Sequence, residues 1–185
     1  MRLGFLAVLW VILQSASALR GDERCGVSFQ LPPKWQVRNI EKSEWPGCTI
    51  GLQPPGWQER RNVSEVRIPE NAMTLTVSRG AAAEDLVNDA GFFRRDGEWF
   101  VEGKGTAKAA SLHGKTWTGA SGEAVVWVGF KDPQRGGHTS RSEFRALLIE
   151  RARHGRTAVI FCNAGFDCET ILPRFVKSVE FVGRH

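Results

Sequence analysis

The sequence predicts one mixed α+β domain in which β-strands outnumber helices. Segments that alternate apolar and polar residues recur along the chain, as in strands with one buried face. Two other segments space their apolar residues three or four apart, as amphipathic helices do. With 42% hydrophobic and 24% charged residues, the composition is that of a globular protein, and the length suits a single core.

The first 18 residues have the character of a secretory signal peptide. Arg2 precedes an apolar stretch over residues 3–13, and small residues follow up to Ala18. This order is typical of signal peptides, and the apolar stretch is shorter than the roughly 20 residues that span a bilayer. We predict cleavage after Ala18 and an exported domain over residues 19–185, periplasmic or secreted and not embedded in the membrane. The alternative is an uncleaved anchor.

All four cysteines lie beyond the predicted cleavage site. An even number in an exported chain favours disulfides over free thiols. Of the three possible connectivities we favour Cys25–Cys48 and Cys162–Cys168, because each pair brackets one local unit. The chain-entropy model assigns about 3.5 kcal/mol to the longer loop and about 2.4 kcal/mol to the shorter one. Neither spacing is that of a C-x-x-C redox pair or a zinc knuckle, so we expect no metal and no cofactor.

The strand pattern is clearest in MTLTVS, where Met73, Leu75 and Val77 face one side. Residues 124–130 and 157–162 are apolar without alternation, which predicts central strands covered on both faces. Further strands are expected at residues 26–31, 48–52, 114–123 and 96–105, the last beginning with an Asp96-Gly97 turn.

Two segments have helical patterns. AAAEDLVNDAGFF consists largely of good helix formers, with Leu86 on its apolar face near Phe93. ETILPRFVKSVEF repeats apolar residues four apart. Because Pro173 fits only in a first helical turn, we expect Thr170 to be the N-cap of this C-terminal helix.

Residues 140–162 fit two structures. Ser140 and Glu143 form a capping-box pattern, and the apolar residues after them follow helical spacing. The same segment also reads as two strands joined at His154-Gly155. Local signals leave this choice open.

VSFQLPPKWQV near the start of the domain, and FVKSVEF after the strand TAVIF near its end, resemble the PsbP-like superfamily. That superfamily contains extrinsic photosystem subunits, a nuclear import factor and many exported bacterial proteins of unknown role. The resemblance implies an antiparallel sheet flanked by helices, an α/β/α sandwich, and favours a hairpin over residues 144–162. The superfamily has no shared catalytic set. No catalytic residue therefore carries over, and this chain departs from the superfamily in its four cysteines and in a long stretch after Leu52.

No catalytic constellation is recognisable. The histidines lack metal-binding spacings such as H-E-x-x-H. His113 is the best candidate base, but no acid can be placed beside it. Ser121 lies in GASGE, which is not the G-x-S-x-G nucleophile motif because Gly122 follows the serine directly. We therefore expect no enzyme, and a periplasmic hydrolase that uses His113 or Ser121 is the alternative.

Residues 52–71 form the most informative surface candidate. Twenty residues without regular structure are uncommon in a compact domain and are often functional. A Pro-Pro-Gly turn presents Trp57 beside Arg60 and Arg61, and Trp and Arg are enriched at binding hot spots. The alternative is that Trp57 folds back as a lid on the sheet. In a second candidate, FFRRDGEWF, packing of the two Phe side chains is favoured over binding.

These observations favour an exported, non-catalytic binding or assembly module that acts through contacts with a protein partner. A narrower version is an inhibitor or immunity-type protein that blocks a secreted hydrolase, because a net charge of +5 suits an acidic cleft. That charge is too small to predict nucleic-acid binding. A small-molecule carrier with a pocket between sheet and helices is a third class.

Overall fold

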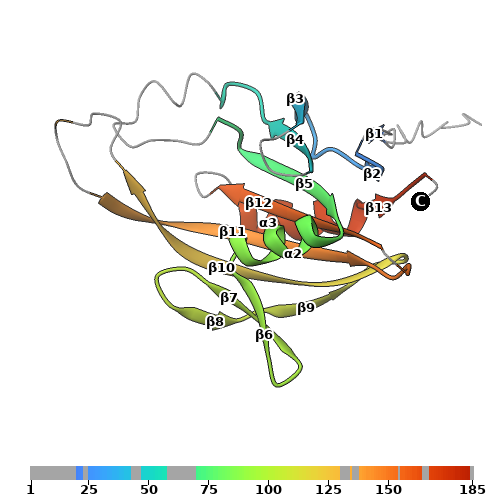
Figure 1. Ribbon diagram of the computed structural model, residues 1–185. Helices are drawn as coiled ribbons and strands as arrows, with labels where there is room; N and C mark the ends of the chain where they lie inside the picture. The colour runs from blue at the N-terminus through green and yellow to red at the C-terminus, as the bar shows by residue number, and fades with distance from the viewer. Residues whose placement is uncertain are drawn as a thin grey trace, which may run out of the picture.

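The computed structural model describes residues 20–22, 25–42, 47–57, 70–129, 134, 138–153, 155–163 and 167–183 of the chain. The predicted signal peptide and its cleavage site at Ala18 lie outside the described residues. Seven strands form the central sheet: β3 (Gln36–Lys42), β4 (Cys48–Gln53), β5 (Met73–Arg79), β9 (Ala110–His113), β10 (Trp117–Gly129), β11 (His138–Glu150) and β12 (Arg156–Asn163). Their order is β3-β4-β5-β12-β11-β10-β9, antiparallel throughout (Figure 1).

Each face of this sheet is covered by one helix and one three-stranded sheet. The α3 face carries α3 (Cys168–Ser178) with β1 (Arg20–Asp22), β2 (Val27–Phe29) and β13 (Glu180–Phe181). The α2 face carries α2 (Ala81–Asp89) with β6 (Phe92–Arg95), β7 (Glu98–Glu102) and β8 (Thr106–Lys108). The antiparallel sheet agrees with the prediction. The flanking layers are largely strands, however, so the fold is β-rich rather than a clear helix-flanked sandwich.

Side-chain alternation along the central strands creates two separate cores. On β11, Ala146 and Leu148 face α3, whereas Leu147 between them faces α2. On β12, Ile160 belongs to the α3 core and Val159 to the α2 core. Each outer layer is therefore held by its own set of apolar contacts.

The two segments expected to be central strands differ in position. β12 lies in the middle of the sheet and is buried almost throughout, as predicted. Residues 124–129 instead continue β10, which is next to the edge strand β9. Val125 on this strand is 37% exposed, so that part of the prediction is wrong. A run of apolar residues is compatible with burial on both faces of a sheet, but it does not predict whether the flanking layers reach far enough to cover that strand.

Residues 140–162 form a hairpin, so the capping-box interpretation is wrong. Ser140 and Glu143 lie within β11, which pairs with β10 on one side and with β12 on the other. Pairing on both sides satisfies the backbone of β11, and the layers on the two faces of the sheet bury its consecutive residues Ala146, Leu147 and Leu148. This tertiary context overrides the local helical signal.

The C-terminal helix begins earlier than predicted. Its N-cap is Asp167, whose carboxylate accepts a hydrogen bond from the backbone N–H of Thr170 at 3.2 Å. Helix α3 then starts at Cys168, and Pro173 lies inside the helix rather than in its first turn. The first helix also differs, because Phe93 belongs to strand β6 and not to the end of α2.

Two disulfides join segments of the α3 core, with the connectivity that we favoured. Cys25 is bonded to Cys48 and Cys162 to Cys168, with Cα–Cα distances of 5.2 and 5.9 Å. The second bond attaches the first residue of α3 to the end of β12. No described helix is long and apolar enough to cross a membrane.

Candidate functional site

The predicted binding residue Trp57 lies in the α3 core. Its side chain is 4% exposed, and its indole N–H donates to the carbonyl of Glu70 at 2.8 Å. Trp57 is therefore folded back onto the sheet, which is the alternative given above for this residue. Arg60 and Arg61 lie outside the described residues. The structure thus offers no exposed Trp57 to a partner.

Ser121 and His113 lie on opposite faces of the central sheet. Ser121 pairs with Ala110 on the edge strand, and His113 pairs with Thr118. Paired residues share a face and successive residues alternate, so the odd separation between Thr118 and Ser121 directs the two side chains apart. The serine and the histidine therefore cannot form a nucleophile–base pair. Nor do three or more His, Cys, Asp or Glu side chains gather into a metal site in the described part of the chain.

The β6–β7 hairpin has a register set by its two-residue turn. Asp96 and Gly97 have φ angles of 53° and 81°, the positive values that a tight type I′ turn requires. Pairing from this turn places Arg94 opposite Trp99 and Phe93 opposite Phe100. One face of the hairpin is buried in the α2 core through Phe92 and Val101. The other face is directed to solvent.

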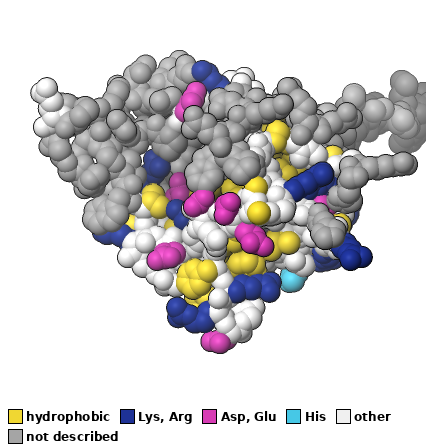
Figure 2. Space-filling view, in the orientation of Figure 1, with side chains coloured by type: hydrophobic (Ala, Val, Ile, Leu, Met, Phe, Trp, Pro, Cys, Tyr) yellow, Lys and Arg dark blue, Asp and Glu magenta, His cyan; other side chains and the backbone are white. Residues whose placement is uncertain are grey.

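Stacked aromatic rings and an arginine form the outer face of the hairpin. The rings of Phe93 and Phe100 are 5.7 Å apart and 19° from parallel. The guanidinium of Arg95 lies over both, 5.8 Å from the first centroid and 5.5 Å from the second. Beside them, Lys108 forms an exposed ion pair with Glu98 at 2.6 Å. Figure 2 shows hydrophobic and Lys/Arg side chains together at the lower end of the molecule, where this hairpin lies in Figure 1.

A second arginine lies where the hairpin meets helix α2. The guanidinium of Arg94 is 4.6 Å from the ring centroid of Trp99. Both line a shallow groove of about 480 Å³ between hairpin and helix, with Val87 and Ile149 in its apolar floor. We call Phe93, Arg94, Arg95, Trp99 and Phe100 together the hairpin surface.

Arg145 of β11 fixes the base of the hairpin. Its Nη1 donates to the carbonyl of Ala90, just before β6, at 2.8 Å and to that of Glu102, at the end of β7, at 3.0 Å. Glu143 balances the charge, with Oε2 at 2.8–2.9 Å from the guanidinium nitrogens. Gly91 allows this approach, since a Cβ there would lie 2.7 Å from the carbonyl of Glu102. The hairpin surface is therefore presented from a rigid base.

The sequence predicts packing contacts for the two Phe side chains of FFRRDGEWF, and the structure shows a different contact for each of them. Phe92 is a core residue, whereas Phe93 stacks on Phe100 outside the core. The Asp96-Gly97 turn was a sufficient signal for this pairing, because a two-residue turn fixes the register. The role of Arg145 was missed. Its only local signal was a charged residue in an otherwise apolar segment.

The neighbouring Arg141 is influenced by its surroundings in two opposing ways. Burial lowers the pKa of its guanidinium, and the carboxylate of Glu143 raises it. One of its amino groups donates to the side-chain oxygen of Asn163 at 3.2 Å. Arg141 is thus a half-buried residue of the α2 face and adds no charge to the hairpin surface.

No family model and no curated protein matches the chain. A solved structure from Bacteroides thetaiotaomicron is similar over 86% of this chain and 46% of that chain, with 12% sequence identity and a TM-score of 0.40. The chain thus spans less than half the length of that protein. A similarity this low carries no functional argument, and membership of the PsbP-like superfamily stays a prediction.

Proposed function

We propose that the protein is an exported, non-catalytic binding module that uses the hairpin surface to contact a protein partner rich in carboxylates. The main support is that Arg94 and Arg95 are exposed and held over aromatic rings, with no ion-pair partner in the described part of the chain. Two disulfides are typical of extracellular or periplasmic proteins and support the exported location.

Ring stacking makes these arginines suitable for recognition. A guanidinium restrained over an aromatic ring loses less conformational freedom when it binds, and its planar donors match both oxygens of a carboxylate. Arg, Trp and other aromatic residues are also the types that dominate binding energy in protein interfaces. The hairpin surface combines them on a rigid support.

The charge pattern favours an acidic protein over nucleic acid. Asp96 is exposed at the turn of the same hairpin, whereas Glu98 beside the turn is paired with Lys108. Asp96 would repel the continuous phosphates of a polynucleotide, whereas a folded protein can offer carboxylates at spaced positions. A hairpin that enters an acidic cleft is also the geometry of the inhibitor or immunity-type role.

The test compares capture of exported proteins by two charge-matched variants. The mature protein carries a photo-cross-linker at Lys108 and is mixed with the exported fraction of its source organism. We expect Arg94→Gln/Arg95→Gln to reduce the cross-linked partner about tenfold, while cross-links to the unmodified hairpin map to acidic residues of that partner.

Arg151→Gln/Arg153→Gln removes the same charge from exposed positions after β11 and serves as the control. It should retain the partner. Equal loss in both variants would mean that bulk charge governs capture. Full retention in the hairpin variant, or no specific cross-link at all, would also contradict the proposal. Circular dichroism confirms that each variant is folded.

A further inference from the structure

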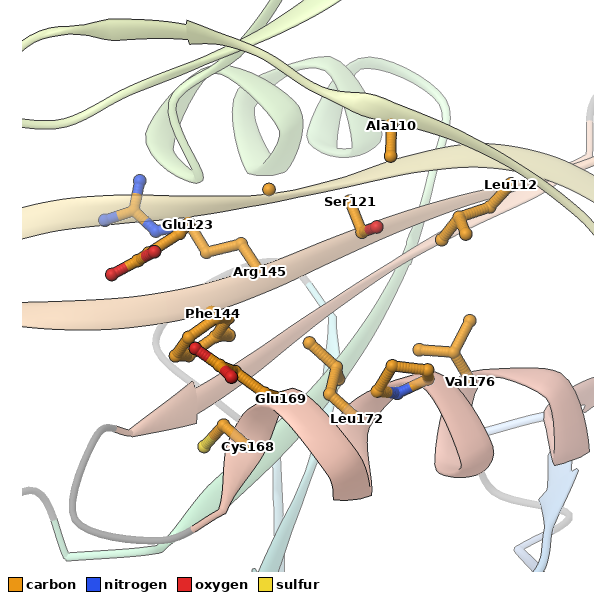
Figure 3. A pocket seen from close by; sticks show the side chains of 12 residues that line it. Ala110, Leu112, Ser121, Glu123, Phe144, Arg145, Cys168, Glu169, Leu172 and Val176 are labelled. Carbon is orange, nitrogen blue, oxygen red and sulfur yellow. The ribbon is translucent and has the colours of Figure 1, made fainter.

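A pocket of about 370 Å³ lies on the α3 face, on the side of the central sheet opposite the hairpin surface. It opens between helix α3 and strands β9, β10 and β11 (Figure 3). Small residues on the strands create it. Ala110 and Ser121 pair across β9 and β10 at this level, and they leave space that the helix does not fill.

One end of the pocket is apolar. Leu172 and Val176 of α3 are almost completely buried and form one wall. Leu112 of β9, which is half-buried, faces them from the sheet, whereas the half-buried Phe144 of β11 pairs with Glu123 and lies at the other end of the pocket. A volume in the range of known ligand sites, with walls of this kind, suits a compact apolar group.

The other end is acidic. Glu123 projects from β10 and Glu169 from the first turn of α3, and Figure 3 shows both carboxylates at the end of the pocket away from Leu112 and Val176. Both side chains are exposed, and neither has an ion-pair partner in the part of the chain that the structure describes. Glu169 lies in the first turn of α3, where a negative side chain interacts favourably with the positive end of the helix dipole.

The nearby Arg145 does not cancel this charge. Its side chain points to the α2 face, where Glu143 and the carbonyls of Ala90 and Glu102 engage the guanidinium. The N-terminus of α3 does not make the site attractive to anions either. Asp167 caps that terminus, and Glu169 places a second carboxylate beside it.

We infer that this pocket binds a small amphipathic cation, with its apolar body between α3 and the sheet and its positive group between Glu123 and Glu169. The pocket is apolar at one end and carries two unpaired carboxylates at the other, which matches an amine attached to an aliphatic or aromatic group. The site shares no residue with the hairpin surface and does not depend on the proposed function.

The experiment uses three eight-carbon ligands with different head groups: octylamine, 1-octanol and octanoate. Their affinities for the mature protein are measured by NMR titration at constant ionic strength. We expect octylamine to bind most tightly and octanoate most weakly. Glu123→Gln/Glu169→Gln should weaken octylamine about tenfold and leave octanol unchanged, because only the charge contacts are removed.

Two further variants complete the test. Ala110→Leu adds bulk at an exposed lining position and should weaken all three ligands. Glu84→Gln/Asp89→Asn removes the same charge from exposed positions of α2 and should have no effect.

Octanoate binding as tightly as octylamine, or an unchanged affinity in Ala110→Leu, would overturn the inference. Absence of binding by any of the three ligands would do the same. Arg94→Gln/Arg95→Gln should bind octylamine normally, which separates this result from the outcome of the partner experiment.

Discussion

The two faces of the central sheet contain closely similar arginine clusters. On the α3 face, Arg156 pairs with Glu150 and its Nη1 donates to the carbonyls of Gly26 and Val182 at 2.6 and 2.7 Å. On the α2 face, Arg145 pairs with Glu143 and donates in the same way to two carbonyls of the outer layer. Each guanidinium also lies over a Phe ring, at 5.0 Å in the first case and 5.5 Å in the second.

The two clusters differ in burial and in what supports them. The side chains of Arg156 and Glu150 are 3% and 7% exposed, and both carboxylate oxygens accept from the arginine. Those of Arg145 and Glu143 are 9% and 13% exposed, and a single oxygen is used. Both disulfides belong to the α3 core. Neither disulfide joins the α2 layer to the sheet.

The two arginine clusters therefore stabilise different parts of the molecule. Arg156 joins Gly26, just before β2, and Val182, just after β13, to the β11–β12 hairpin. It does so in the same core as the two disulfides. Arg145 fixes the base of the hairpin surface without a disulfide beside it. We therefore expect damage to the α3 cluster to affect global stability most, and damage to the α2 cluster to have a more local effect.

The largest effect is expected for Arg156→Leu. This change removes the guanidinium that balances the buried carboxylate of Glu150, together with its hydrogen bonds to the carbonyls of Gly26 and Val182, so the free energy of unfolding should fall by about 3–5 kcal/mol. Urea titration followed by Trp fluorescence measures it. Lys115→Gln, which breaks the exposed pair with Glu180, should cost less than about 1 kcal/mol. Similar losses in both variants would show that the buried pair has no special role.

The disulfides should follow. Replacing Cys25 and Cys48 by Ser should lower the free energy of unfolding by about 3.5 kcal/mol, and replacing Cys162 and Cys168 by about 2.4 kcal/mol. The bonds close loops with sequence separations of 23 and 6 residues, so the first restrains the unfolded chain more. Paired denaturant titrations decide the order, and the reverse order would contradict the loop-entropy explanation.

Of the two arginine clusters, the one on the α2 face should show the smaller global effect: Arg145→Met is expected to cost about 2–3 kcal/mol, because its ion pair is more exposed. Hydrogen exchange should show where the loss occurs. Amides of β6 and β7 should exchange faster, while those of β2 and β13 keep their protection. Arg94→Gln serves as a control for charge on the hairpin and should leave both sets unchanged. Faster amide exchange throughout the protein would contradict the view that the Arg145 cluster acts locally and the Arg156 cluster globally.

Local signals were sufficient for several elements. The alternation around Met73 predicted β5, the apolar run at residues 157–162 predicted the central strand, and the Asp96-Gly97 turn marked the hairpin that carries the candidate site. Each depends on residues adjacent in sequence. The start of α3 differs from the prediction. Pro173 favours a first helical turn after Thr170, whereas the helix is capped by Asp167 and includes Pro173 in its interior.

The amino-acid sequence by itself determined where strands and turns form and which cysteines were available for disulfides, since these follow from side-chain alternation, backbone preference and composition. Only the tertiary structure decided which arginines are buried, that Trp57 packs in the core, and that Ser121 and His113 face apart. These properties depend on strand register and on contacts between distant segments, such as that of Arg156 with Gly26 and Val182. The pocket beside α3 also depends on contacts between distant segments. Its two carboxylates come from β10 and α3, and they line one pocket only when the helix docks on the sheet.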